Sequence, residues 1–215
     1  MGLKKGTGTF IVAPILPWRR PPDCGKLPGM PRTPRASVAL RVLAWCLMPK
    51  HYHLVLWTLE DGDLSRWMHW LQNTHVRRYH RHYHTAGHLW QGRYKAFPIA
   101  HDEYLLTALR YVERNGLRAG LCARVEDYPW SSAALAMPGA ARPAFWHPGP
   151  VARPEPWLAW VQEPATLAEE AALRACLVRG RPYGPEPWQR ATAAALGLEA
   201  TLRPRGLPRK GAAEK

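Results

Sequence analysis

Two apolar segments with the composition of β-strands follow each other closely near residue 50. Residues 38–46 read "VALRVLAWC" and residues 53–57 read "HLVLW", with a Met48-Pro49 break between them. Branched and aromatic side chains favour strands, and a connection this short favours an antiparallel pair. This pair constrains the fold more than any other feature, because it requires a sheet that contains an antiparallel hairpin.

A long helix is expected after the hairpin. The sequence "DGD" at 61–63 can turn the chain and cap a helix, and apolar residues then recur at roughly helical spacing through His84. Gly87 is expected to end this helix. Residues 90–99, "WQGRYKAFPI", alternate in the manner of a third strand.

More helices are expected in the second half of the chain. Asp102 can cap a helix over residues 103–115, which Gly116 is expected to stop. Residues 166–180 and 185–198 are expected to form two further helices. Because strands and helices are intermixed, the predicted class is α+β, with helices packed on a small antiparallel sheet and a helical C-terminal extension.

The composition divides the chain into four parts. Residues 1–36 are rich in Pro and Gly and hold seven Lys/Arg with a single acidic residue, so they are expected to form a basic, poorly ordered leader. No strand or helix is expected before Val38. A domain over 37–136, a Pro/Gly-rich linker over 137–156 and a helical segment with a basic tail over 157–215 are expected to follow.

The charge of the chain indicates a polyanionic partner. Thirty Lys+Arg against sixteen Asp+Glu give a formal net charge of +14. Nucleic acid is the usual reason for such an excess, although a genome that favours arginine is an alternative explanation for part of it. No apolar run approaches the ~20 residues that cross a bilayer, so no membrane partner is expected. The four scattered cysteines fit a reducing compartment, and a cytoplasmic, nucleoid-associated protein is expected.

The histidine pair at the start of the second strand is a candidate metal site. Strand alternation would put His51 and His53 on one face, roughly 7 Å apart along the chain. Neutral imidazoles at this separation can bind one divalent ion from neighbouring coordination positions. Two ligands are too few, so a third is needed from elsewhere. The alternative is a pair of half-buried histidines that pack at a sheet edge.

A tyrosine and an asparagine lie one turn apart on the helix after Asp102. Tyr111 and Asn115 are four residues apart and therefore share a side of the helix. A phenol is a poor nucleophile at neutral pH because its pKa is near 10, but beside a metal-polarised phosphodiester it can attack phosphorus. Asn115 would then supply the missing ligand. The alternative is that Tyr111 is an ordinary core or surface aromatic residue.

Basic and aromatic residues are interleaved over residues 75–95, "HVRRYHRHYHTAGHLWQGRYK". Eight of the ten histidines of the chain fall between His51 and His88. Basic side chains neutralise phosphates and aromatic rings stack on unpaired bases. A solvated helix face and a zinc-binding histidine tract are the alternatives. The basic residues expected to contact DNA here are Arg77, Arg78, Arg93 and Lys95.

Four sequence motifs together resemble one known family. "CLMPKHYHLVLW", "GHLWQGRYKAF", "YLLTALRYVERNGLRAGL" and "DYPWSSA" occur in this order. They resemble the REP-associated tyrosine transposases, which are IS200-like, single-tyrosine HUH nucleases. The resemblance covers about residues 42–134, and "LVRGRPYG" and "LRPRGLPRK" resemble the C-terminal portion of this family.

The resemblance implies a concrete chemistry. His51, His53 and Asn115 would hold Mg²⁺ or Mn²⁺, and Tyr111 would be the nucleophile that forms a 5′-phosphotyrosine on single-stranded or hairpin DNA. The fold would be the HUH sheet, a ferredoxin-like antiparallel platform with helices against it. No nucleotide cofactor is implied, and a monomer is expected. The tail residues that would help to grip the DNA are Arg203, Arg205, Arg209 and Lys210.

The chain also departs from this family, which leaves two alternatives. The family usually opens with a strand and a long helix, which are not expected here before Val38, and it usually has Asn-Pro where this chain has Asn115-Gly116. One alternative is an inactive or domesticated relative that binds structured DNA and cuts nothing. The other is an unrelated metallohydrolase that uses the two histidines and an acidic residue of the 60–63 turn.

Overall fold

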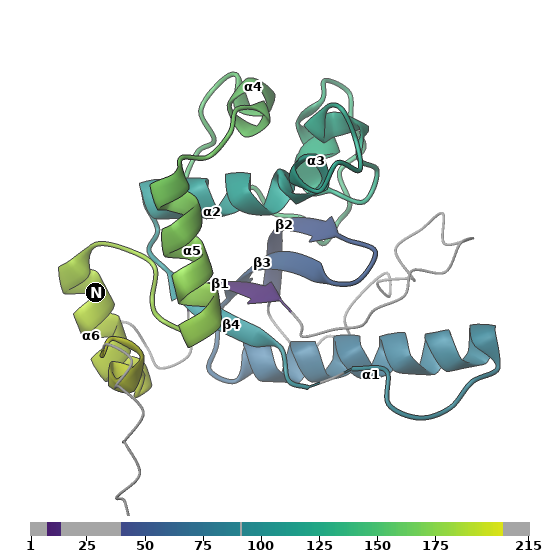
Figure 1. Cartoon of the computed structure of the whole chain (residues 1–215), viewed down its shortest axis with the longest axis horizontal. Helices are drawn as coiled ribbons and strands as arrows, with labels where there is room; N and C mark the ends of the chain where they lie inside the picture. Colours follow the sequence, from purple (N-terminus) through teal and green to yellow (C-terminus); the bar gives the residue numbers. More distant parts are fainter. Residues whose placement is uncertain (1–7, 14–39, 91, 204–215) are drawn as a thin grey trace, which may run out of the picture.

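The chain forms a four-stranded antiparallel sheet with helices on both faces, in a computed structural model that describes residues 8–13, 40–90 and 92–203 (Figure 1). The strand order is β2-β3-β1-β4, and each strand is antiparallel to its neighbours. The strands are β1 Gly8–Ala13, β2 Leu40–Leu47, β3 Tyr52–Thr58 and β4 Lys95–Ile99. The predicted α+β class, with helices on a small antiparallel sheet, is confirmed.

An inner strand of the sheet, β1, comes from the segment that was expected to be a poorly ordered leader. It pairs with β3 on one side and with β4 on the other. Ile11 and Val12 are 1% and 0% exposed, so the strand is part of the core. The prediction was wrong for residues 8–13 because this apolar run is short and its partners are far away in the sequence. The rest of the 1–36 segment lies outside the described residues.

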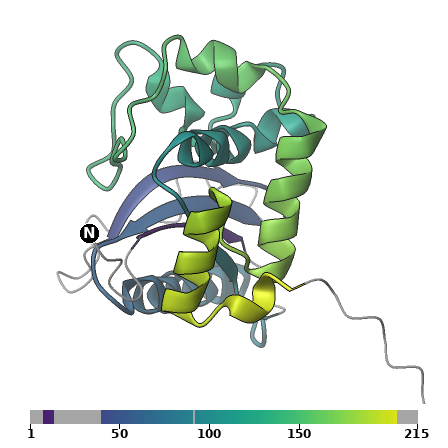
Figure 2. The same cartoon turned by 90° about the vertical axis from the view of Figure 1, so that its left-hand side faces the viewer.

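Helices α1 and α2 cover opposite faces of the sheet. β3 and β4 run parallel to each other with β1 between them, and α1 (Asp63–Tyr83) connects them, which gives a split β-α-β unit. α2 (Glu103–Glu113) lies across the other face, against β2 and β3 (Figures 1 and 2). Side chains that alternate along β3 therefore point either to α1 or to α2.

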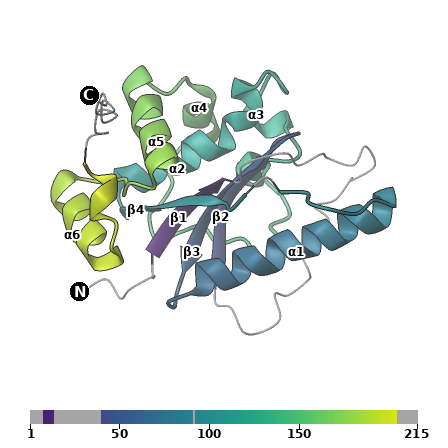
Figure 3. The same ribbon diagram turned by 60° about the horizontal axis from the view of Figure 1, so that its bottom comes forward.

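The remaining helices follow α2 in the chain. They are α3 Asn115–Arg118, η1 Val125–Asp127, η2 Ser132–Ala136, α4 Trp157–Gln162, α5 Leu167–Arg179, α6 Glu186–Leu196 and η3 Glu199–Thr201. α5 contacts β4, and Figure 3 shows α5 and α6 on the β4 side of the sheet. The helices expected over 166–180 and 185–198 correspond to α5 and α6, whereas α4 was not predicted. Within the described ranges no helix is long and apolar enough to cross a membrane.

The segment over 137–156 lies along the outer edge of β2 and is not a free linker. The amide of His147 donates to the carbonyl of Val42 (2.9 Å), and the indole of Trp146 donates to the carbonyl of Leu43 (3.1 Å). Unpaired strand edges invite pairing with other chains. This segment covers the β2 edge and anchors the part of the chain that leads to α4.

Three element boundaries differ from the prediction. α1 ends at Tyr83, and the next residue, His84, adopts a left-handed conformation (φ 51°) three residues before Gly87. The predicted strand over 90–99 is shortened to β4, and Trp90 lies before it with its ring against those of Tyr52 (5.9 Å between centroids) and His75. α2 ends at Glu113, before Gly116.

Gly116 does not stop the α2 helix but lies inside α3. A Cβ at this position would come within 2.6 Å of Cδ1 of the Tyr128 ring, closer than real Cβ contacts allow. The Tyr128 hydroxyl donates to the carbonyl of Leu47 at the end of β2 (2.7 Å). Gly116 therefore lets this ring pack between α3 and the sheet. Tyr128 belongs to the "DYPWSSA" motif, which has a structural role here.

Candidate active site

The histidine pair lies on the face of the sheet that α2 covers. A tight turn, in which the amide of Met48 donates to the carbonyl of His51 (2.8 Å), brings the chain from β2 into β3. Strand alternation then directs His51 and His53 to the same side. Their ring centroids are 4.8 Å apart. The prediction that the two imidazoles lie on the same face of the sheet is confirmed.

His53 is a buried imidazole with both ring nitrogens free. Its side chain is 4% exposed, and neither nitrogen has a hydrogen-bond partner among the described residues. Burial lowers the pKa of His53 to about 3, and the nearby His51 and Arg118 add to this effect. Burial also lowers the pKa of His51, again with a contribution from Arg118. Both rings are therefore neutral at physiological pH and keep the lone pair that a metal ion needs.

Tyr111 lies against the histidine pair. The Asp102 side chain caps α2 by accepting from the amide of Tyr104 (3.0 Å), and Leu105 and Leu109 face the core. This arrangement directs Tyr111 toward β3, where its ring centroid lies 5.8 Å from that of His53. The Tyr111 side chain is 8% exposed. The tyrosine and the two histidines thus come together, as the resemblance given in the sequence analysis implies.

Asn115 adjoins the site, but its side chain is already engaged. It is fully buried, and its amide nitrogen donates to the carbonyl of Tyr111 (2.7 Å). Its Oδ1 accepts a hydrogen bond from Nη2 of Arg118 (2.7 Å). The Arg118 guanidinium also lies over the Tyr111 ring, with 5.3 Å between Cζ and the ring centroid. The oxygen expected to bind a metal ion is therefore held by an arginine.

Arg118 lies beside the candidate site and was not singled out in the sequence analysis. Its position three residues after Asn115, within the "NGLR" that forms α3, places both side chains on one side of that turn. This spacing was the available signal.

Within the described ranges, no group of three or more His, Cys, Asp or Glu side chains gathers in a way that could hold a metal ion.

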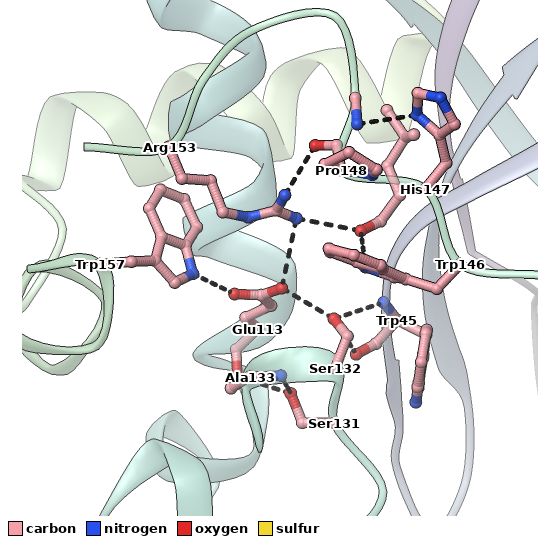
Figure 4. A network of polar contacts seen from close by, with 12 residues as sticks. Trp45, Glu113, Ser131, Ser132, Ala133, Trp146, His147, Pro148, Arg153 and Trp157 are labelled. Carbon is pink, nitrogen blue, oxygen red and sulfur yellow. Dashed lines mark hydrogen bonds and ion pairs between the residues drawn. The ribbon is translucent and has the colours of Figure 1, made fainter. Parts of the chain in front are cut away.

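A buried polar network fixes the C-terminal end of α2, two residues after Tyr111 (Figure 4). The Glu113 carboxylate accepts from Ser132 Oγ (2.8 Å) and from the indole of Trp157 (2.7 Å), and Arg153 lies 3.7 Å away. Arg153 in turn donates to the carbonyl of Leu43 in β2 (3.0 Å). Burial raises the pKa of Glu113, and the Arg153 guanidinium opposes this shift.

Removal of the Glu113 carboxylate should destabilise the fold strongly. Glu113→Ala leaves the Arg153 cation and the Trp157 N–H without their buried partner, so we expect a loss of about 3–5 kcal/mol in the free energy of unfolding. Glu170→Ala is the matched control, because Glu170 pairs with Arg174 on the surface of α5 and should cost no more than about 0.5 kcal/mol. Urea unfolding measures both, and equal losses would contradict this role of the network.

The predicted DNA-contacting residues lie in separate parts of the structure. Arg77 and Arg78 are exposed on the C-terminal half of α1, which extends beyond the sheet (Figure 1). Arg93 is exposed just before β4, where Lys95 is half-buried. Arg203 is exposed just after η3. The other tail residues, Arg205, Arg209 and Lys210, lie outside the described residues.

Part of the chain matches a known family model. Residues 32–115 match the family model described as "Transposase IS200 like". This part of the chain is similar to the IS200-like transposases. The family match contains His51, His53, Tyr111 and Asn115, and it ends before Arg118.

One curated relative and one solved structure are similar to the chain. The relative is a "REP-associated tyrosine transposase" of Escherichia coli (strain K12), 27% identical over 92 residues. That alignment covers 41% of this chain and spans only about half, 52%, of the relative. The solved structure is a "REP associates tyrosine transposase bound to a REP hairpin", with 20% identity and a TM-score of 0.47, covering 68% of this chain and 89% of that one.

Proposed function

We propose that this protein is an IS200-like transposase that nicks and rejoins single-stranded or hairpin DNA through a covalent link to Tyr111. The single observation that carries the proposal is the distance of 5.8 Å between the ring centroids of Tyr111 and the buried, unbonded His53. A phenol beside two neutral imidazoles is the combination that metal-assisted phosphoryl transfer to tyrosine requires. An isolated core tyrosine has no need of such neighbours.

The proposed reaction exchanges one phosphoester for another. The Tyr111 oxygen attacks the phosphorus of a phosphodiester and forms a new O–P bond, while the phenol proton passes to solvent. The bond between phosphorus and the 3′-oxygen breaks, and that oxygen keeps the electron pair and takes up a proton. The products are a 5′-phosphotyrosine and a free 3′-hydroxyl. No nucleotide cofactor is required, since attack by a 3′-hydroxyl reverses the step and rejoins strands.

His51 and His53 are suited to hold Mg²⁺ or Mn²⁺. Their rings are adjacent and neutral, and His53 has no competing hydrogen bond among the described residues. Asn115 would be the third protein ligand once its Oδ1 is released by Arg118. When bound, the ion would polarise the phosphodiester and offset the developing negative charge.

The exposed basic residues would bind the DNA outside the active site. Arg77, Arg78 and Arg93 are exposed near the α1 side of the sheet, where they can neutralise phosphates without contacting the reacting bond. We propose a second set of DNA-binding residues in the C-terminal part of the chain, namely Arg203, Arg205, Arg209 and Lys210. Such contacts make binding, unlike chemistry, strongly dependent on salt.

A covalent-adduct assay tests the proposed function. The protein is incubated with Mn²⁺ and a labelled single-stranded hairpin oligonucleotide, a probe chosen because the curated relative is named for REP elements. We expect a labelled band that survives a denaturing gel. His51→Ala and His53→Ala should each abolish this band and leave salt-sensitive DNA binding nearly unchanged.

The histidine controls make the assay specific. His69→Ala removes an exposed histidine of α1 whose ring contacts Asn73 and not the site, so its adduct should match that of the wild type. Binding of the hairpin without any adduct by the wild-type protein would favour the alternative, a relative that binds DNA and cuts nothing. Turnover of a small substrate by a histidine-dependent but DNA-independent route would favour the metallohydrolase.

A further inference from the structure

We propose that Arg118 binds the phosphate of the DNA to be cut and that, without DNA, it holds Asn115 Oδ1 away from the metal ion. This inference rests on the proposed function, because it assigns a role within the same site. Arg118 would then bind Asn115 Oδ1 in the free protein and the DNA phosphate in the complex. Three observations support this role.

The first observation is the contact that Arg118 makes now. Its Nη2 donates to Asn115 Oδ1 at 2.7 Å, a short hydrogen bond from a charged donor. A guanidinium has donors only, so a cation that approached the same oxygen would meet a like charge. Asn115 can therefore serve as a metal ligand only after Arg118 has moved.

The second observation is the position of Arg118 beside the groups that would react. Its Cζ lies 5.3 Å from the centre of the Tyr111 ring. The Tyr111 ring in turn lies against that of His53, with 5.8 Å between the centroids. A phosphate brought to Tyr111 would arrive within reach of this side chain.

The third observation is the unneutralised charge of Arg118. Among the described residues it forms no ion pair, although other arginines nearby have acidic partners, as Arg124 has in Glu126. Arg118 is also exposed, so an incoming ligand can reach it. A planar guanidinium matches two phosphate oxygens in a bidentate arrangement and binds them more strongly than a neutral amide oxygen. We therefore expect a phosphate to replace Asn115 Oδ1 as the hydrogen-bond acceptor of Arg118.

The proposal predicts opposite effects of one substitution on two measurements. In DNA-free protein, Arg118→Ala should bind Mn²⁺ about tenfold more tightly than the wild type, because it removes a like charge and frees Asn115 Oδ1. The same variant should form the covalent adduct with the labelled hairpin about a hundredfold more slowly, because a charged donor to the phosphate is lost. Mn²⁺ binding is followed by electron paramagnetic resonance of the free ion, and adduct formation by denaturing gel.

Two further variants separate this role from charge and folding effects. Arg124→Ala removes one exposed positive charge that is paired with Glu126 and that does not contact Tyr111 or Asn115, so both measurements should stay at the wild-type level. Arg118→Lys keeps the positive charge but lacks the planar guanidinium that can bind two phosphate oxygens. It should slow adduct formation while leaving the Mn²⁺ affinity near that of the wild type. Circular dichroism checks that each variant is folded.

The outcomes for Arg118 can be told apart from those for the proposed function. Equal Mn²⁺ affinity of the wild type and Arg118→Ala, or an adduct formed by that variant at the wild-type rate, overturns the role of Arg118 alone. Weaker Mn²⁺ binding by Arg118→Ala also overturns it, because it would mean that Arg118 only positions Asn115. If the wild type forms no adduct, the proposed function itself fails.

Discussion

Tyr111→Phe is expected to abolish the covalent protein–DNA adduct. The substitution removes only the attacking oxygen, so we expect the rate of adduct formation to fall by at least about a thousandfold, to the limit of detection. The phenylalanine ring can keep the packing against His53 and under Arg118, and the fold should be retained. The measurement is the denaturing gel with the labelled hairpin and Mn²⁺, together with a thermal unfolding curve.

Tyr104→Phe is the matched control for this experiment. Tyr104 lies on the same helix, but its ring packs against Tyr183 (4.9 Å between centroids) and not against the histidine pair. Its adduct should form at the wild-type rate. An adduct that persists at the wild-type level in Tyr111→Phe would show that another side chain is the nucleophile.

Val12→Asp is expected to unfold the protein. Val12 is fully buried in β1, between Leu54 of β3 and Ala96 of β4. A carboxylate here would have no partner, and we expect a cost of more than about 5 kcal/mol, which is close to the whole stability of an ordinary domain. Circular dichroism and urea unfolding should show loss of the cooperative transition.

Val178→Asp is the corresponding change at an exposed position. Val178 is 59% exposed on α5, so the new carboxylate remains in water and the free energy of unfolding should change by no more than about 0.5 kcal/mol. If Val12→Asp is as stable as this control, residues 8–13 are not an inner strand of the sheet. The sheet would then lack the connection between β3 and β4.

Local patterns explain which parts of the fold could be predicted. β2 and β3 are adjacent in the chain, and their apolar composition alone identifies them as a hairpin. α2 has its cap and its core stripe within one short segment. β1 could not be recognised in this way, because Gly8–Ala13 is a six-residue run whose partners are Leu54–Thr58 on one side and β4 on the other. Only tertiary pairing makes it a strand.

The same distinction applies to the site. His51, His53 and Tyr111 carry chemistry that is visible in their residue types and motif spacing, and the structure brings the three rings together. Glu113 could not be singled out, because an acidic residue near the end of a helix is usually solvated. Its partners Ser132, Arg153 and Trp157 lie on segments that approach α2 only in the folded chain.

The central claim is that Tyr111 becomes the covalent attachment point of the DNA, and peptide mapping of the adduct tests it most directly. The adduct is treated with nuclease and trypsin, which cuts after Arg110 and Arg114 and so separates Tyr111 from Tyr104. The account predicts that the peptide "YVER" carries the mass of a 5′-linked nucleotide. A nucleotide found on any other peptide, with "YVER" unmodified, would contradict it.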